Sequence, residues 1–194
     1  MARPREFDVD AALERAMQVF WAKGYESTSL DDLCEATCLG RSSLYAAFGD
    51  KHGLYLRALD RYEESSAARI NDALTRPVPV REAIAVFIDR LIDEIVAGPG
   101  RRGCLIGNCA AELARDDGEA AARVHRSLQR IETAFRDALG RAKARGELAP
   151  AADVVALARF LTAGIQGLRL VGKATPDRAA LRDVAGVMLR CLDG

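Results

Sequence analysis

Hydrophobic positions recur with the period of an α-helix over most of the chain. In residues 13–21 the apolar side chains stand at i, i+3, i+4, i+7 and i+8, as an amphipathic helix requires. Residues 80–95 and 124–142 follow the same template, and no segment alternates as a half-buried strand does. The pattern therefore predicts an all-α protein.

Prolines fall between these periodic runs, where they can end or precede a helix without breaking one. They are Pro77, Pro79, Pro99, Pro150 and Pro176. Helices of common length with short connections would fill the chain with about nine helices.

The first 50 residues differ from the rest because capping and turn residues recur at short intervals. Thr28 or Ser29 can cap a short helix, and a tight turn over residues 38–40 follows it. The apolar face of that helix is Leu30, Leu33, Cys34 and Thr37. A second short helix points Leu44 and Phe48 inward. Two short helices joined in this way and packed on a longer first helix predict a helix-turn-helix unit.

The outer face of the second short helix has the chemistry of a DNA-reading surface. It consists of Arg41, Ser42, Ser43, Tyr45, Ala46 and Ala47. The polar side chains suit phosphates and base edges, and the alanines permit close approach to a groove. Lys51 and His52 begin the next helix, where a cation and free backbone N–H groups can hold a phosphate. The alternative is a merely solvated polar face.

Residues 24–59 resemble the N-terminal DNA-binding domain of the tetracycline-repressor (TetR) family of bacterial regulators. They read GYESTSLDDLCEATCLGRSSLYAAFGDKHGLYLRAL. The family pattern is matched at Phe20, Gly24, Tyr25, Thr28 to Leu30, Leu33 to Thr37, Ser43 to Phe48, and Lys51. The remaining helices fit the family's length and all-helical plan without a diagnostic motif. The resemblance implies that the chain contacts a double-stranded DNA operator through Thr28, Arg41, Ser42, Ser43, Tyr45, Lys51 and His52.

Two positions depart from the family pattern. Cys38 stands where the turn has glycine, and Gly40 replaces the serine that caps the recognition helix. A cysteine with positive φ costs about 1 kcal/mol, and we expect Gly40 to relieve this strain by letting the turn shift. The start of the helix decides whether Arg41 reaches a base or only a phosphate.

The chain is expected to divide into a helix-turn-helix domain over 1–53 and a ligand-binding and dimerisation domain over 54–194. Residues 153–171 are apolar nearly all round and include Gly164 and Gly167. A helix apolar on all sides needs cover on all sides. In the family, the helices 153–171 and 177–192 resemble the homodimer interface, which implies a near-palindromic operator. Burial within a monomer is the alternative.

Composition indicates one ordinary globular chain. The 194 residues are 49% hydrophobic and carry 28 Lys+Arg against 28 Asp+Glu, which excludes disorder. Residues 1–60 hold 7 Lys+Arg against 10 Asp+Glu. The cations nevertheless stand at the N-terminal arm (Arg3, Arg5), the recognition helix and the helix after it. We therefore expect few phosphate contacts and a modest salt dependence of DNA binding.

The cysteine count and the N-terminal residues favour the cytoplasm. Five cysteines are an odd number, and MARPREFDVD opens the chain without an apolar signal segment. Apolar stretches such as 83–88 fall short of the roughly 18 residues of a membrane span. We expect reduced thiols and no membrane association.

Residues 101–112 form an unusual segment around Cys104. Arg101 and Arg102 precede this cysteine, and neighbouring cations lower the pKa of a thiol. The pattern GCLxxxxxAE also resembles the branch of the family that includes the N-ethylmaleimide-responsive repressor. This resemblance implies that Cys104 senses electrophiles and oxidants; the alternative is that it only packs.

Metal and catalytic sites are not expected. Cys34 and Cys38 supply two soft ligands without a nearby histidine, and four are usual. No catalytic constellation or cofactor-binding motif is present. A small-molecule effector is instead expected to meet polar groups on otherwise apolar inner segments. The candidates are Cys104, Asn108, His125, Phe135, Gln166 and Arg169.

These observations lead to two functional hypotheses. The first is a dimeric DNA-binding regulator, a repressor released from its operator by a small molecule or a thiol-reactive compound. The second is a helical small-molecule-binding protein or enzyme whose N-terminal unit makes only protein contacts. The absence of a strongly basic recognition helix favours the second, and the TetR resemblance favours the first.

Overall fold

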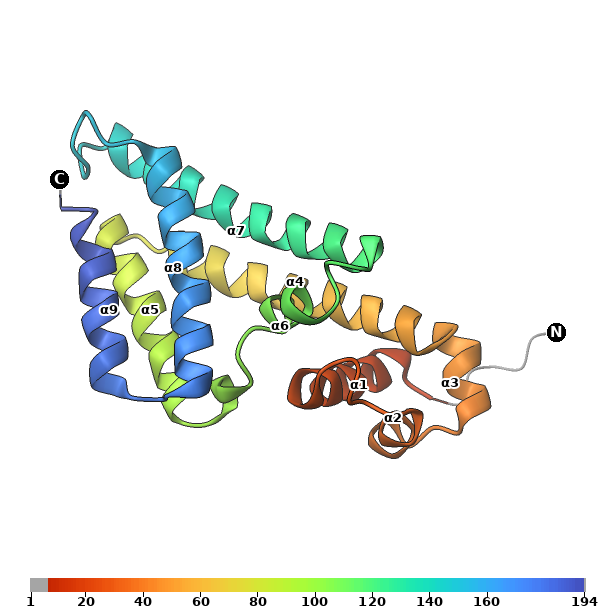
Figure 1. Cartoon of the computed structure of the whole chain (residues 1–194). Coiled ribbons are helices and arrows are strands. Elements are labelled where there is room, and N and C mark those ends of the chain that lie inside the picture. The colour runs from red at the N-terminus through yellow and green to blue at the C-terminus, as the bar shows by residue number, and fades with distance from the viewer. Residues whose placement is uncertain (1–6, 194) are drawn as a thin grey trace.

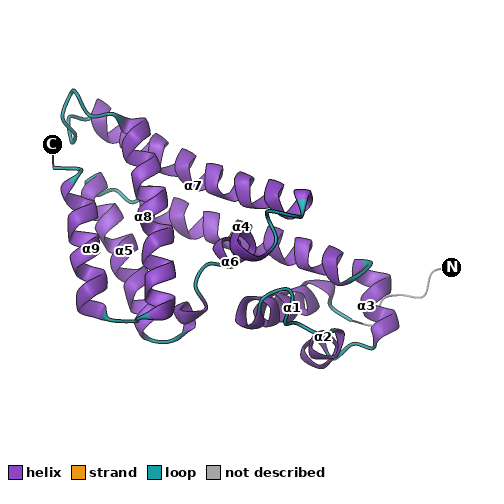
Figure 2. Cartoon of the chain, viewed as in Figure 1, coloured by secondary structure: helices purple, strands orange, loops and turns teal. Residues whose placement is uncertain are grey.

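A computed structural model describes residues 7–193, and within this range the chain forms nine α-helices, one short 3-10 helix and no strand (Figure 2). The all-α prediction is confirmed. The N-terminal elements are α1 (Val9–Lys23), α2 (Leu30–Thr37), α3 (Arg41–Phe48) and α4 (Lys51–Leu74). The others are α5 (Val80–Val96), η1 (Pro99–Arg102), α6 (Leu105–Glu112), α7 (Gly118–Ala144), α8 (Val154–Ala174) and α9 (Arg178–Arg190).

The helices gather at the two ends of the long helix α4 (Figure 1). Helices α1, α2 and α3 lie at its N-terminal end, and α5, α8 and α9 lie together at the other. Helix α7 runs alongside α4, and α6 lies between the two groups, packed against α7, α4 and α1. Helix α6 is therefore placed to connect the three N-terminal helices with the C-terminal body.

Aspartate and serine side chains fix most helix starts. A carboxylate or hydroxyl accepts hydrogen bonds from first-turn N–H groups at Asp8, Ser29, Asp50, Asp117, Asp153 and Asp177. Each such cap stabilises its helix by about 1 kcal/mol. The start of α3 at Gly40, of α5 at Pro79 and of α6 at Cys104 has no side-chain cap. Two of these three helices, α3 and α6, carry the candidate sites.

The hydrophobic core has two parts. One fills the space among α5, α8, α9 and the far ends of α4 and α7. The other unites the apolar faces of α1, α2 and α3 with the first half of α4, and it also includes side chains from the α6 region. Those side chains are Cys104, Leu105, Ile106 and Cys109. Helix α6 therefore packs with the N-terminal unit, although 67 residues lie between the end of α2 at Thr37 and the start of α6 at Leu105.

Candidate DNA interface and effector site

The turn between α2 and α3 retains the backbone strain. Cys38 has φ 57° and ψ 32°, in the left-handed region, and no other non-glycine residue of the described chain has positive φ. Its N–H donates to the carbonyl of Glu35, and that of Leu39 donates to Cys34, at 3.3 and 3.2 Å. Gly40 is extended at φ −70° and ψ 156°. The expectation that Gly40 relieves the strain is therefore wrong, because Cys38 itself takes the left-handed conformation that ends α2.

Helix α3 presents the face that the sequence predicts. Leu44 and Phe48 are buried against the N-terminal core. Arg41, Ser42, Tyr45 and Ala46 are exposed, while Ser43 and Ala47 are half-buried. Tyr45 stands out as a large side chain that remains 42% exposed. Because much of the Tyr45 ring is not packed against the protein, it can contact DNA.

The uncapped start of α3 adds backbone donors to this face. The first turn of a helix has N–H groups without intrahelical acceptors, and the helix dipole makes that end attractive to anions. A side chain satisfies such groups at the other helices of this unit but not at Gly40. An eight-residue helix is about 12 Å long and can lie in the major groove of DNA.

Arg41 is held by an acidic neighbour on α2. Its guanidinium donates to the Asp31 carboxylate at 2.7 Å, and both side chains are exposed. The hydrogen bond and charge of Asp31 raise the pKa of Arg41, so the guanidinium stays charged. A phosphate or guanine contact by Arg41 must replace this ion pair.

The start of α4 contributes one cation to the same side. The Lys51 ammonium lies over the Tyr25 ring, 4.4 Å from its centre, and makes a cation–π contact with it. Asp50 caps α4 by accepting from the Gly53 N–H at 2.7 Å. Lys51 therefore keeps a defined position beside α3. The predicted phosphate contacts of Arg3 and Arg5 fall outside the described residues.

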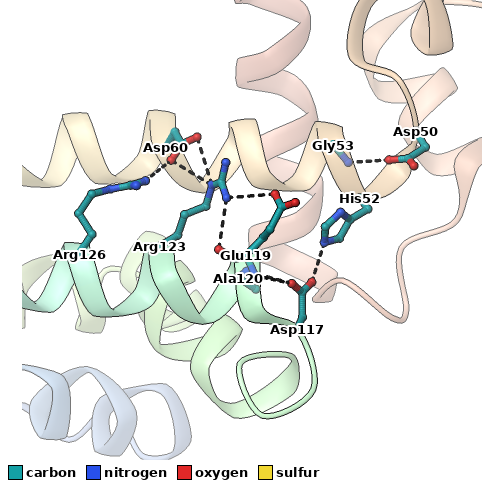
Figure 3. Close-up of polar contacts among 9 residues, drawn as sticks. All are labelled: Asp50, His52, Gly53, Asp60, Asp117, Glu119, Ala120, Arg123 and Arg126. Carbon is teal, nitrogen blue, oxygen red and sulfur yellow. Dashed lines mark hydrogen bonds and ion pairs between the residues drawn. The ribbon is translucent and has the colours of Figure 1, made fainter.

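Two predicted DNA-contacting side chains have other partners. Thr28 is 1% exposed, and its hydroxyl donates to the Gly24 carbonyl at 2.5 Å, so it has no free group to offer. Ser29, not Thr28, caps α2. The ring of His52 lies 2.6 Å from the Asp117 carboxylate at the start of α7 (Figure 3). The prediction is wrong for the Thr28 side chain, and His52 instead joins the N-terminal unit to the body.

The contact of His52 with Asp117 belongs to a wider set of polar contacts between α4 and α7. Figure 3 shows Arg123 and Arg126 of α7 reaching toward Asp60 of α4. The nitrogens of Arg123 and Arg126 approach the Asp60 carboxylate to 3.2 and 2.6 Å. Polar contacts therefore join the N-terminal halves of α4 and α7.

The α6 region is also hydrogen-bonded to α1 and to the loop between α1 and α2. The Glu112 carboxylate accepts from the backbone N–H of Tyr25 at 3.0 Å and from that of Glu26 at 2.8 Å. The Trp21 indole donates to the Gly103 carbonyl at 3.1 Å. Sequence reasoning missed Glu112 because its partners are backbone groups 86 and 87 positions away, which leave no pattern in the sequence.

A cavity of about 460 Å³ lies among α6, α7 and α8. It is lined by Gly103, Cys104, Ile106, Gly107, Asn108, Ala110, Ala111, Val124, Leu128, Gln166, Gly167, Arg169, Leu170 and Lys173. The structure therefore brings together four of the six residues expected to meet a ligand: Cys104, Asn108, Gln166 and Arg169.

The other two candidates lie elsewhere. Phe135 is fully buried in the distal core and packs edge-to-face against Phe87, so its placement at a ligand site is wrong. His125 is exposed on α7, whereas its neighbour Val124 lines the cavity. The helical period explains the error, since adjacent residues differ by about 100° in direction.

Cys104, Tyr62 and Arg169 are linked inside the protein. The Arg169 guanidinium donates to the Tyr62 hydroxyl at 3.2 Å, and that hydroxyl donates to the Cys104 sulfur at 3.7 Å. Burial and the adjacent thiol raise the pKa of Tyr62 to about 12.

Arg169 is the cation that acts on Cys104. Burial raises the pKa of the Cys104 thiol, but the charge of Arg169 and hydrogen bonds to the sulfur outweigh burial, so the pKa is lowered. Arg102, expected to act on the thiol, donates instead to the Gln18 side chain at 2.5 Å. The pKa of Cys104 is therefore lowered, as the sequence predicts. The cation that lowers it, Arg169, comes from α8, 65 residues further along the chain.

No metal site is visible within residues 7–193, where no three His, Cys, Asp or Glu side chains gather as a metal would require. The five cysteines are free thiols. A larger hollow of about 650 Å³ lies at the turn between α4 and α5. Its lining is drawn mainly from residues 74–83, with Arg141 of α7 and Arg145 just after that helix.

The helix-turn-helix geometry and the separate helical body are typical of one-component DNA-binding regulators. Two known protein families match these two parts of the chain. Residues 12–58 match the family model described as bacterial regulatory proteins, tetR family. Residues 80–188 match the model of the tetracyclin repressor-like C-terminal domain. The chain belongs to the TetR family of DNA-binding transcription regulators, which are not enzymes.

Relatives of known name are similar over the full length. The chain is 36% identical to the HTH-type transcriptional repressor ComR of Escherichia coli K12, over 97% of this chain and 90% of ComR. It is 37% identical to the HTH-type transcriptional regulator YezE of Bacillus subtilis 168, over 100% of each. Family membership decides against the alternative of an enzyme with an N-terminal unit for protein contacts.

A solved relative has been captured on DNA. A cysteine mutant of the TetR family regulator CifR, in complex with 26-bp double-stranded operator DNA, is 36% identical with a TM-score of 0.83. The match covers 97% of this chain and 98% of that one. The reduced form of E. coli NemR has a TM-score of 0.84 at 16% identity, so that likeness concerns the fold alone.

Proposed function

We propose that this protein is a homodimeric repressor that binds a near-palindromic operator and leaves it when the cavity in its body is occupied or Cys104 is modified. The outward face of α3 carries this proposal: exposed Arg41, Ser42 and Tyr45 beside an uncapped helix start. Residues 1–53 would bind DNA, and residues 54–194 would bind the effector and dimerise. Because operator DNA is cytoplasmic in bacteria, so is the proposed activity.

The contacts to DNA follow from the exposed groups. Tyr45 and Ser43 would meet base edges or phosphates in the major groove, while Lys51 and the start of α3 would hold phosphates on either side. Arg41 would exchange Asp31 for DNA. Few cations are involved, so the salt dependence of binding should be modest.

Exposed apolar side chains support dimerisation through α8 and α9. They are Val155, Phe160, Leu170 and Val171 on α8, and Val184 and Val187 on α9. By length and composition α8 would suffice to cross a membrane, which corrects the expectation that every apolar stretch falls short. A single such helix is weak evidence for a membrane span. In this family a partner subunit accounts for such a face, and in a single chain only 28% of the apolar window of α8 is buried.

Helix α6 connects the effector cavity with the helix-turn-helix unit. One side of α6 lines the cavity through Gly107, Ala110 and Ala111, and its last residue, Glu112, holds the loop between α1 and α2. A ligand that displaces α6 would therefore move that loop and with it the orientation of α3. Two such shifts in a dimer would change the separation of the two recognition helices and weaken operator binding.

Modification of Cys104 would act at the same place. A maleimide-type electrophile would form a carbon–sulfur bond to the thiolate, while its alkene electron pair takes a proton from water. Arg169 would then lose the adjacent negative charge. The alternative, that Cys104 only packs, is tested by treating Cys104→Ser with the electrophile. Loss of operator binding at an unchanged dose would show that another residue responds.

The experiment is a mobility shift with DNA from upstream of the protein's own gene and its neighbour. Wild type should bind specifically at low salt, and Tyr45→Ala should weaken specific binding by about 1–3 kcal/mol. Ala122→Ser, on the exposed side of α7, is the control. If the folded dimer binds no such DNA specifically, or if its salt dependence implies many released counterions, the proposed contact surface is wrong.

A further inference from the structure

Two side chains that line the cavity among α6, α7 and α8 each carry a buried hydrogen-bond donor that has no acceptor in the protein. They are the side-chain nitrogen of Gln166 and the Nε of Arg169. Both residues line the cavity, and they are three positions apart on α8, so they lie on neighbouring turns of the same helix face. Buried donors without acceptors are rare because each loses its contact with water. Two of them at one cavity point to a ligand that supplies acceptors.

The charge of the cavity indicates that this ligand is an anion. Arg169 is only 8% exposed, yet no carboxylate forms an ion pair with it among the described residues. Lys173 is the second cation of the lining, and no Asp or Glu contributes to it. The carboxylate of Glu94 on α5 favours the charged form of Arg169 and raises its pKa, but Glu94 does not line this cavity. A buried guanidinium requires a counter-charge, and inside the protein the groups that act on it most are the Tyr62 hydroxyl and the Cys104 thiol.

The remainder of the lining indicates the shape of the ligand. Ile106, Val124 and Leu128 line the cavity, together with the small residues of α6. A phosphate would need several more donors than these, whereas the two oxygens of a carboxylate match one guanidinium and one amide. An apolar body would then lie against the aliphatic side chains.

We propose that this cavity binds a small amphipathic monocarboxylate, with its carboxylate on Arg169 and Gln166 and its apolar body against Ile106, Val124 and Leu128. The bound carboxylate replaces the Cys104 thiol as the neighbour of the Arg169 charge. The proposed binding is argued from the cavity alone, whereas release of DNA by the carboxylate rests on the proposed function.

Calorimetry and thermal unfolding test the binding. The probes are straight-chain carboxylates from butanoate to decanoate, benzoate and phenylacetate, each paired with its primary amide. At least one carboxylate should bind wild type about tenfold or more tightly than its amide, because a charge-assisted contact is lost in the amide. Arg169→Gln should lose that preference, and Gln166→Leu should weaken binding by a smaller factor. Arg136→Gln, an exposed arginine of α7, should bind as wild type does.

A second readout uses Cys104 directly and does not depend on DNA. Saturating carboxylate should slow alkylation of Cys104 by iodoacetamide in wild type, but not in folded Arg169→Gln. Absence of carboxylate binding across the panel, or equal binding by Arg169→Gln, overturns the inference. Binding that passes both tests without displacing operator DNA would leave this inference intact and contradict the effector arm of the proposed function.

Discussion

The carboxylate of Glu112, the last residue of α6, accepts a hydrogen bond from the backbone N–H of Tyr25, 3.0 Å away in the loop that precedes α2. A second bond from the Glu26 N–H makes the contact bidentate. Gly24 lies directly against the same carboxylate, which an added Cβ would approach to 3.1 Å. A glycine therefore permits Glu112 to reach the backbone. Two hydrogen bonds therefore join the end of α6 to the start of the helix-turn-helix unit.

Replacing Glu112 should loosen the N-terminal unit. In Glu112→Ala two backbone N–H groups lose their acceptor, and we expect the free energy of unfolding to fall by about 1 kcal/mol, since water can partly replace an exposed carboxylate. Glu112→Gln keeps one acceptor oxygen and should lose less. Urea unfolding measures both. Glu64→Ala, an exposed glutamate of α4, should leave stability unchanged. An equal loss in the control would remove the special role of Glu112.

Removing the partner of Arg41 should tighten DNA binding. Asp31→Asn frees the guanidinium from its 2.7 Å ion pair and removes a negative charge beside α3. We expect operator affinity to rise roughly two- to fivefold at low salt, with a smaller gain at high salt because exposed charges are screened. Fluorescence anisotropy with labelled operator measures this change. Weaker binding by Asp31→Asn would mean that Asp31 positions Arg41 for DNA instead of competing with it.

The stability of the helix-turn-helix unit should depend on pH through Asp32. Lys23 and the N–H and hydroxyl of Ser29 hold the pKa of this carboxyl at about 2, below its ordinary 3.8. A depressed pKa stabilises the folded state above the ordinary value, and the contribution disappears as pH falls from about 3.8 toward about 2.

Asp32→Asn provides the comparison. The variant should be less stable than wild type near pH 6, and the difference should shrink as pH is lowered through that window. Thermal unfolding from pH 6 to pH 2 follows both proteins. A difference that stays constant with pH would assign the stabilisation to the cap geometry and not to the charge.

Charging the exposed apolar face of α9 should prevent dimerisation. Val187 is 54% exposed in a single chain, and Val187→Asp would place a carboxylate in the proposed interface, where its desolvation is costly. Analytical ultracentrifugation should find a dimer for wild type and a monomer for the variant, and specific operator binding should be lost with the dimer. Ala122→Asp on α7 should remain dimeric. A dimeric Val187→Asp would place the interface elsewhere.

The recognition helix could be predicted from the sequence because its signals are local. The apolar pair Leu44 and Phe48 fixes which side of α3 faces inward, and the polar face follows from the helical period. His52 could not be assigned in this way. Its partner Asp117 is 65 positions away and is brought to it only by the packing of α7 on α4.

The effector cavity shows the same limit. The polar residues of α8 could be predicted as pocket candidates because Gln166 and Arg169 interrupt an apolar run. Phe135 could not be distinguished from a pocket residue, since a core phenylalanine and a lining one have the same helical spacing. That Arg169, not Arg102, is the cation that lowers the pKa of the Cys104 thiol depends on how α8 packs, which no spacing within residues 101–112 encodes.

Selection of bound DNA from a random duplex library tests the central claim most directly, because it assumes no target gene. Wild-type protein should enrich sequences with two half-sites related by two-fold symmetry, their centres about 10 bp or a multiple of it apart. Tyr45→Ala should lose or relax that preference, whereas Ala122→Ser should retain it. If the folded wild-type protein enriches no sequence, or enriches a single unpaired half-site, the protein does not act as a dimeric operator-binding repressor through α3.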